Sequence, residues 1–207
     1  MITDNIEFLR KRMQFGHGYF YYAFIKVKSE TMGSTDGVIL KSYVISSEKY
    51  LDRYITEIKY LCDKLNARCY VLLNRRSMQR VTEKYNEYVD RLLDLGSNIE
   101  TLANPLHRVC MEMDRKSDEE PVTIIDLNNR LMSEEENIKA ILYGFGKDII
   151  QFKIPTLNGG SHLVCRKLPR EVVEQLNAMK IPALFNMPTI LYANDSQVIL
   201  QLGKKKK

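Results

Sequence analysis

Apolar residues form short continuous runs in some stretches and recur every three or four positions in others, and this difference separates predicted strands from predicted helices. Residues 19–27 and 38–45 are rich in aromatic and β-branched side chains, which favours strands. From 47 to 65, apolar residues recur every three or four positions, as in an amphipathic helix. A strand over 67–73 and a helix that ends near Gly96 follow. The first half therefore has a predicted order of β-β-α-β-α.

The second half contains short apolar runs bounded by Gly, Pro and Asn, which is typical of strands. The predicted strands and helices, in chain order, are a strand at 122–127, a helix, strands at 148–154 and 162–165, a helix at 170–179, and apolar runs at 181–185 and 189–192. This order, β-α-β-β-α-β, predicts an RRM-like or ferredoxin-like core.

The chain thus has a predicted α+β fold with two parts. Residues 1–110 would form an N-terminal α/β lobe, and residues 120–203 an RRM-like core with a weak edge strand at 196–202. The boundary is expected between them, where an acidic run covers residues 112–120. Four lysines at 204–207 form a basic tail.

Composition and charge indicate a globular protein of the cytoplasm. Its 207 residues are 44% hydrophobic and 28% charged, which argues against disorder. No apolar run of about 18 residues occurs, and the N-terminus lacks a signal-peptide layout, so no membrane association is expected. The four cysteines form no Cys-x-x-Cys pair and are interpreted as reduced core residues. The tail supplies four units of the net charge of +5, and it either attracts nucleic acid or only aids solubility.

Three polar residues are expected to meet on the second sheet. In a β-α-β-β-α-β unit the end of the first strand lies beside the start of the third, which brings Asp126 and Asn128 close to His162. Residues two apart on a strand share a face. Carboxylate and carbonyl oxygens suit Mg²⁺ or Mn²⁺, and a histidine can contact a triphosphate. The plainer interpretation is a polar end to a strand.

Three segments resemble the archaeo-eukaryotic primase superfamily, in particular its phage-type primase-polymerases. The segment IIDLN at 124–128 resembles the apolar strand that ends in Asp-x-Asp, and IPTLNGGSH at 154–162 resembles the small-residue turn before a histidine-bearing strand. A third segment, NMPTILY at 186–192, is also similar. The resemblance implies an RRM-like core, catalytic roles for Asp126, Asn128 and His162, and Mg²⁺ or Mn²⁺ held by Asp126 and Asn128. The turn residues Asn158, Gly159 and Gly160 would let phosphate approach backbone N–H groups.

Two departures from the family pattern weaken the expected catalysis. The second acidic residue is Asn128, and residues 180–184 offer no carboxylate where a third is expected. Asp195 follows the last strand and is a poor substitute. We therefore predict a primase-polymerase-like protein that acts on nucleic acid or nucleoside triphosphates, with weak metal-dependent nucleotidyl transfer or none. The alternative is a noncatalytic interaction or assembly protein, with a protein partner in replication or phage assembly; an RRM-like RNA binder is the third possibility.

Other candidate residues give weaker indications of function. Arg75 and Arg76, at a predicted strand-to-helix junction, are candidate phosphate ligands, although a solvated turn is the plainer interpretation. His17 and His107 lack a carboxylate at useful spacing, and a structural role is expected. The aromatic run in 19–22 is expected to pack in the core. No P-loop motif is present.

Overall fold

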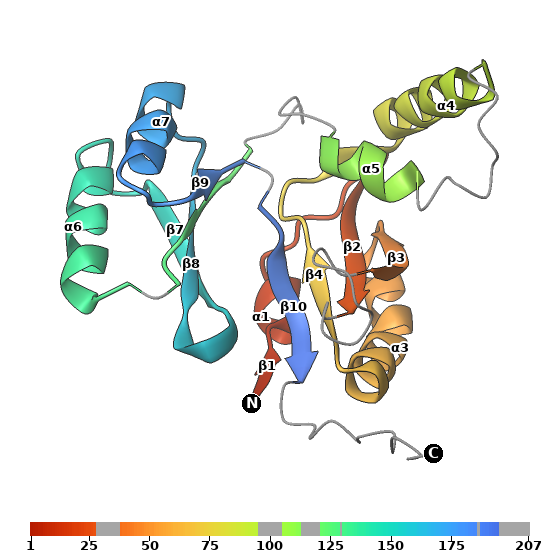
Figure 1. The fold of residues 1–207 in the computed structure, drawn as a ribbon, viewed down its shortest axis with the longest axis horizontal. Coiled ribbons are helices and arrows are strands. Elements are labelled where there is room, and N and C mark those ends of the chain that lie inside the picture. Colours follow the sequence, from red (N-terminus) through yellow and green to blue (C-terminus); the bar gives the residue numbers. More distant parts are fainter. Residues whose placement is uncertain (28–37, 95–104, 113–120, 129, 186, 195–207) are drawn as a thin grey trace, which may run out of the picture.

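The computed structural model describes residues 1–27, 38–94, 105–112, 121–128, 130–185 and 187–194. It has a mixed α+β fold with two antiparallel sheets, which confirms the predicted class. The predicted edge strand at 196–202, the tail at 204–207, Asp195 and most of the acidic run lie outside the described residues. Figure 1 shows the two sheets side by side, each with its own helices.

The first sheet has the strand order β1-β10-β4-β2-β3, with β5 pairing to β2. Its strands are β1 (Ile2–Asp4), β10 (Thr189–Asn194), β4 (Ala67–Val71), β2 (Tyr19–Val27), β3 (Ile39–Ile45) and β5 (Arg76–Ser77). Its helices are α1 (Ile6–Arg10), α3 (Glu48–Leu65), α4 (Met78–Asp94) and α5 (Pro105–Glu112).

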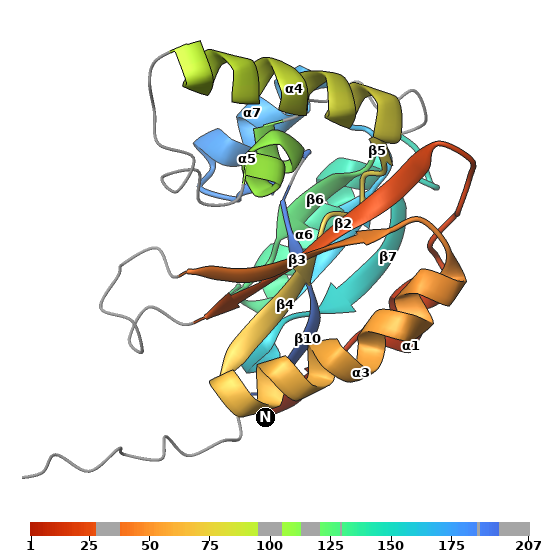
Figure 2. The ribbon, with the colours of Figure 1, turned by 90° about the vertical axis from the view of Figure 1, so that its right-hand side faces the viewer.

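Strand β2 is buried on both faces, which explains its nearly continuous apolar sequence. Successive side chains of a strand point to opposite faces. Tyr21 and Ile25 pack toward α1 and α3, whereas Phe20, Tyr22 and Phe24 pack toward α4 and α5. Figure 2 shows α3 and the α4–α5 pair on opposite sides of this sheet. The prediction that the aromatic run packs in the core is confirmed.

The second sheet has the strand order β7-β8-β6-β9, and every neighbouring pair is antiparallel. The elements, in chain order, are β6 (Thr123–Asp126), α6 (Met132–Tyr143), β7 (Ile150–Pro155), the short 3₁₀ helix η2 (Leu157–Gly159), β8 (Ser161–Cys165), α7 (Arg170–Ala178) and β9 (Ala183–Leu184). Helices α6 and α7 cover one face through Ile138, Leu142 and Leu176. The other face carries Ile154 and Val164, which join the core of the first sheet.

Strand β10 does not follow the predicted division of the chain between residues 110 and 120. It lies within the range 120–203 assigned to the second unit, yet it pairs with β4 and β1 of the first sheet. The apolar run at 189–192 is buried in that sheet. The Asn5 side-chain amide holds the start of β10 in place, because it donates to the carbonyls of Ile190 (2.8 Å) and Pro155 (2.9 Å). The chain therefore crosses between the sheets twice.

Asn74 is a second link between the two sheets, and it is buried. Its side-chain oxygen accepts from the Val122 N–H at 2.7 Å, and its amide donates to the carbonyls of Val122 (3.1 Å) and Phe185. These bonds join the end of β4 to the entrance of β6 and the exit of β9. One side chain thus satisfies backbone groups where both chain crossings occur.

Several elements, among them α5 and β1, were not predicted. Helix α5 forms at Pro105–Glu112, where no helix was predicted, and it buries Val109 and Cys110 against β2. The three-residue β1 forms because β10 offers it a pairing edge, a tertiary cause with no local sequence signal. All four cysteines are free and buried, as predicted. Over the described ranges, no helix is long and apolar enough to cross a bilayer.

Candidate functional site

Asp126 and His162 face each other across β6 and β8. They are register partners, and His162 Nε2 lies 3.9 Å from Asp126 Oδ1. Both side chains lie on the sheet face that points away from α6 and α7, because the alternate residues Ile125 and Leu163 pack under those helices. The expected meeting of these two residues, 36 positions apart, is confirmed. The pair therefore lies on the face directed toward the first sheet.

The His162 ring is buried, and its second nitrogen contacts the first sheet. Its Nδ1 lies 3.1 Å from the hydroxyl of Thr189, at the start of β10. Burial lowers the pKa of His162, and the nearby Asp126 carboxylate opposes that shift in part. A neutral ring carries one N–H, and Nε2 is the nitrogen that faces a carboxylate. We therefore assign the proton to Nε2, with the Thr189 hydroxyl donating to Nδ1.

Asn128 lies beyond the end of β6 and turns toward the β7–β8 connection. Its N–H donates to Asp126 Oδ1 at 2.8 Å, which is the side-chain-to-backbone bond of an Asx turn. Its side-chain oxygen accepts from the Thr156 hydroxyl. Strand β6 ends at Asp126, so Asn128 lies in the turn after the strand and not on the strand itself. Asn128 instead links two segments of the site.

Two backbone N–H groups at the glycine turn are bonded within the turn. Thr156 N–H donates to the Gly160 carbonyl at 2.9 Å, and Gly160 N–H donates to the Leu157 carbonyl at 3.1 Å. Gly159 has φ +75°, a left-handed conformation that favours glycine. Asn158 lies within η2. The two bonded N–H groups are therefore not available to a ligand in this conformation.

Arg75 and Arg76 lie just before α4, as predicted, but their surroundings differ. Arg76 is buried, and its guanidinium donates to the carbonyls of Cys110 (3.0 Å) and Asn74 (2.9 Å). It holds α5 against the first sheet, so it is a structural residue and not a surface phosphate ligand. Arg75 is half-buried and donates to the Gln14 carbonyl at 2.9 Å.

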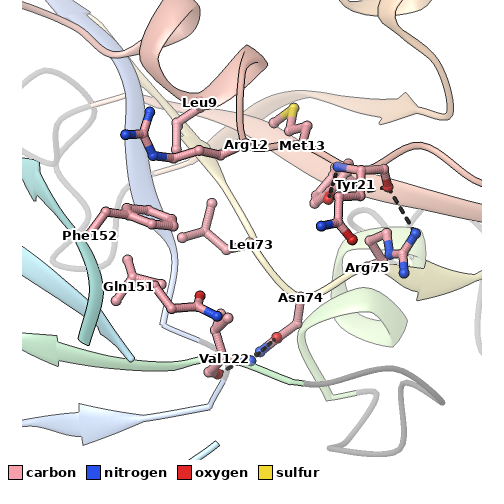
Figure 3. A pocket seen from close by; sticks show the side chains of 12 residues that line it. Leu9, Arg12, Met13, Tyr21, Leu73, Asn74, Arg75, Val122, Gln151 and Phe152 are labelled. Atoms are coloured by element: carbon pink, nitrogen blue, oxygen red, sulfur yellow. Dashed lines mark hydrogen bonds between the residues drawn. The ribbon is translucent and has the colours of Figure 1, made fainter. Parts of the chain in front are cut away.

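Arg75 lines a cleft between the two sheets with a volume of about 350 Å³. Figure 3 shows Arg12 and Phe152 on one side of Leu73 and Arg75 on the other. The lining residues are Leu9, Arg12, Met13, Gln14, Tyr21, Leu73, Asn74, Arg75, Val122, Gln151, Phe152 and Val164. Sequence reasoning missed this cleft, because its residues come from six separate stretches of the chain and form no local motif.

The donor set for a metal is small. Within the described part of the chain, no group of three His, Cys, Asp or Glu residues is placed to hold an ion. Asp126 is the carboxylate of the site, and one of its oxygens already accepts from Asn128. His107, in contrast, is structural: its Nδ1 lies 3.1 Å from the Tyr22 hydroxyl, its ring packs edge-on against Phe24, and burial lowers its pKa.

Comparisons with known proteins identify no relative. No family model, no curated protein and no solved structure matches this chain.

Proposed function

We propose that this chain is a primase-polymerase-like protein that binds a nucleoside triphosphate or nucleic acid at the Asp126–His162 pair. The observation that supports this proposal most is that pair, 3.9 Å apart on the face of the second sheet opposite α6 and α7. The order β6-α6-β7-β8-α7-β9, with the antiparallel strand order β7-β8-β6-β9, supports an RRM-like core for the second unit.

The two side chains have complementary roles in this proposal. With its proton on Nε2, His162 donates to a phosphate oxygen, and Thr189 keeps the ring in that tautomer. Asp126 contributes one carboxylate to Mg²⁺ or Mn²⁺, an ion that keeps most of its waters and takes further oxygens from substrate phosphates. The Asn128 carbonyl adds a weak oxygen ligand.

This donor set favours binding over catalysis. A two-metal clamp on an in-line displacement needs several carboxylates to hold both ions. Here one carboxylate is present, and the Asn128 oxygen also accepts from Thr156. We therefore propose nucleotidyl transfer at a low rate or none, with ligand binding as the retained property.

A noncatalytic interaction or assembly protein is the second candidate. It is favoured by the internal bonding of Thr156, Asn128 and Gly160, which stabilises the β7–β8 connection without any ligand. In that case the three segments that resemble the primase family would serve the fold alone. The two candidates differ in whether Asp126 and His162 bind anything.

Calorimetry with ATP and Mn²⁺ separates these candidates. For wild type, we expect binding that Asp126→Ala and His162→Gln each weaken by about tenfold or more, since each removes one charged or polar ligand contact. Asp148→Ala is the matched control, because Asp148 is an exposed carboxylate before β7. If wild type and Asp126→Ala bind equally, the nucleotide-site proposal is wrong and the assembly protein is favoured.

A gain-of-function variant tests the metal assignment independently. Asn128→Asp restores a second carboxylate beside Asp126, and we expect it to bind Mn²⁺ about tenfold more tightly or better. Asn137→Asp, on the exposed side of α6, adds the same charge elsewhere. Equal Mn²⁺ affinity in the two variants would contradict metal binding at this site. A steep fall of DNA affinity with salt in wild type would further support nucleic acid as a ligand.

A further inference from the structure

The cleft between the sheets is distinct from the Asp126–His162 pair. Val164, which lines the cleft, lies two residues after His162 on the same face of β8, a separation of about 7 Å along a strand. Val122 lines it from the opposite end of β6, before the strand begins. We infer that this cleft binds a small organic phosphate with a planar, largely apolar body, of nucleotide size.

Charge is the first support for this inference. Among the described residues that line the cleft, two are arginines and none is acidic. Arg12 forms no ion pair with a described carboxylate; its Nη1 donates to the Phe8 carbonyl at 2.8 Å. Guanidinium groups bind phosphate through paired N–H donors, and a lining with arginines and no acidic residue favours anions.

Both guanidiniums are held in place before a ligand arrives. Arg12 lies over the ring of Phe8 at 3.6 Å and 5.0 Å from the ring centre of Phe152, so it sits between one aromatic residue from each sheet's unit. Arg75 is fixed by the Gln14 carbonyl and lies 5.3 Å from the ring centre of Tyr19. Preorganised donors lower the entropy cost of binding.

The walls between the arginines fit a planar body. Leu73, Phe152 and Val164 supply apolar surface, and Gln151 and Gln14 supply polar groups at the exposed rim. Figure 3 shows Arg12 next to the Phe152 ring and Arg75 on the far side of Leu73. A planar ring can stack beside Phe152 and Arg12, while a phosphate reaches Arg75. The volume of about 350 Å³ lies in the range of small-molecule sites.

The test compares adenosine monophosphate (AMP) with adenosine by calorimetry in the presence of EDTA. We expect wild type to bind AMP about tenfold more tightly than adenosine or better, because the phosphate adds charge-assisted hydrogen bonds. Arg75→Gln is expected to remove that difference. Undetectable AMP binding, or equal affinity for AMP and adenosine in wild type, overturns the inference.

A second variant separates a direct loss of AMP binding from a folding defect in Arg75→Gln. Gln151→Glu places a negative charge at the exposed rim of the cleft without removing any bond that Arg75 makes, and we expect it to weaken AMP binding by about tenfold. Gln175→Glu is the matched control, because Gln175 is exposed on α7, which covers the face of the second sheet away from the cleft. Equal affinities in these two variants contradict the inference.

This test is independent of the proposed function. Without a divalent ion, Asp126→Ala is expected to leave AMP affinity unchanged, since Asp126 does not line the cleft. If Asp126→Ala abolishes AMP binding in EDTA, the ligand binds at the other site and the inference about the cleft is wrong. Loss of Mn²⁺-dependent ATP binding alone would instead count against the proposed function only.

Discussion

Gly160 lies directly against the side chain of Asn128. A Cβ atom at position 160 would be 1.8 Å from Asn128 Oδ1 and 2.8 Å from Thr156 Oγ1. The hydrogen bond between Thr156 and Asn128 therefore depends on a glycine at this position. This contact ties the end of β6 to the turn between β7 and β8, and through that turn it positions the start of the strand that carries His162.

Gly160→Ala is therefore expected to destabilise the protein by about 1–3 kcal/mol, because the new methyl group displaces Asn128 and breaks its bond to Thr156. Urea denaturation measures the change. Gly16→Ala is the control, since a Cβ there meets its nearest neighbour, Arg75, at 3.4 Å. In an Asn128→Ala background, the same Gly160→Ala change is expected to cost much less; an undiminished cost would show that another contact is responsible.

Thr189→Val is expected to destabilise the protein by about 1–3 kcal/mol, because it leaves the buried Nδ1 of His162 without its hydroxyl donor. Thr189→Ser keeps the hydroxyl and is the matched control. Nitrogen NMR of the His162 ring provides the second readout: wild type and Thr189→Ser should show the proton on Nε2. A wild-type ring protonated on Nδ1 would contradict the assigned direction of this bond.

Stability is expected to fall as the pH drops from about 7.5 to 5, in part because of His162. Burial lowers the pKa of this ring in the folded state, so the unfolded chain binds the proton more readily. The contribution of His162 to folding stability is thus complete above the unfolded pKa of about 6.5, and it is lost as the pH falls below that value.

His162→Gln should make this pH dependence shallower in urea unfolding at several pH values. His107 also has a pKa lowered by burial, so part of the dependence should remain in that variant. His17→Gln removes an exposed histidine and serves as the control. A slope that is the same in wild type and His162→Gln would exclude His162 as a source.

Asn74→Ala is expected to cost about 2–4 kcal/mol, since it leaves buried backbone groups of Val122 and Phe185 without their side-chain partner. Asn137→Ala, at an exposed position on α6, is the control. Because Asn74 joins the two sheets, limited proteolysis near residue 122 should also accelerate in Asn74→Ala. Unchanged stability and unchanged cleavage would show that the link is dispensable.

Local sequence patterns predicted the elements whose own residues indicate which side chains are buried. The aromatic and β-branched run of β2 and the three-and-four spacing in α3 gave bounds within one residue of those observed. The meeting of Asp126 and His162 followed from element order, because adjacent antiparallel strands bring distant residues into register. These predictions needed only period, turn residues and topology.

The features that sequence reasoning missed all depend on contacts between distant segments. The apolar run of β10 fits either sheet, and only its pairing with β4 and β1 decides between them. Arg12 and Phe152 are 140 positions apart and meet because α1 packs against β7 (Phe8 and Phe152 rings at 5.8 Å). Neither the cleft nor the role of Thr189 has a local signal for this reason.

The position of β10 between β1 and β4 also constrains how this protein is made. During synthesis, residues 2–71 emerge from the ribosome long before residues 189–194. Until β10 emerges, β4 lacks one of its two neighbours and the first sheet is incomplete. An unpaired strand edge invites pairing with other chains. The second sheet, whose strands lie within residues 123–184, can form in the meantime. The unit that begins the chain is therefore the one that is completed last.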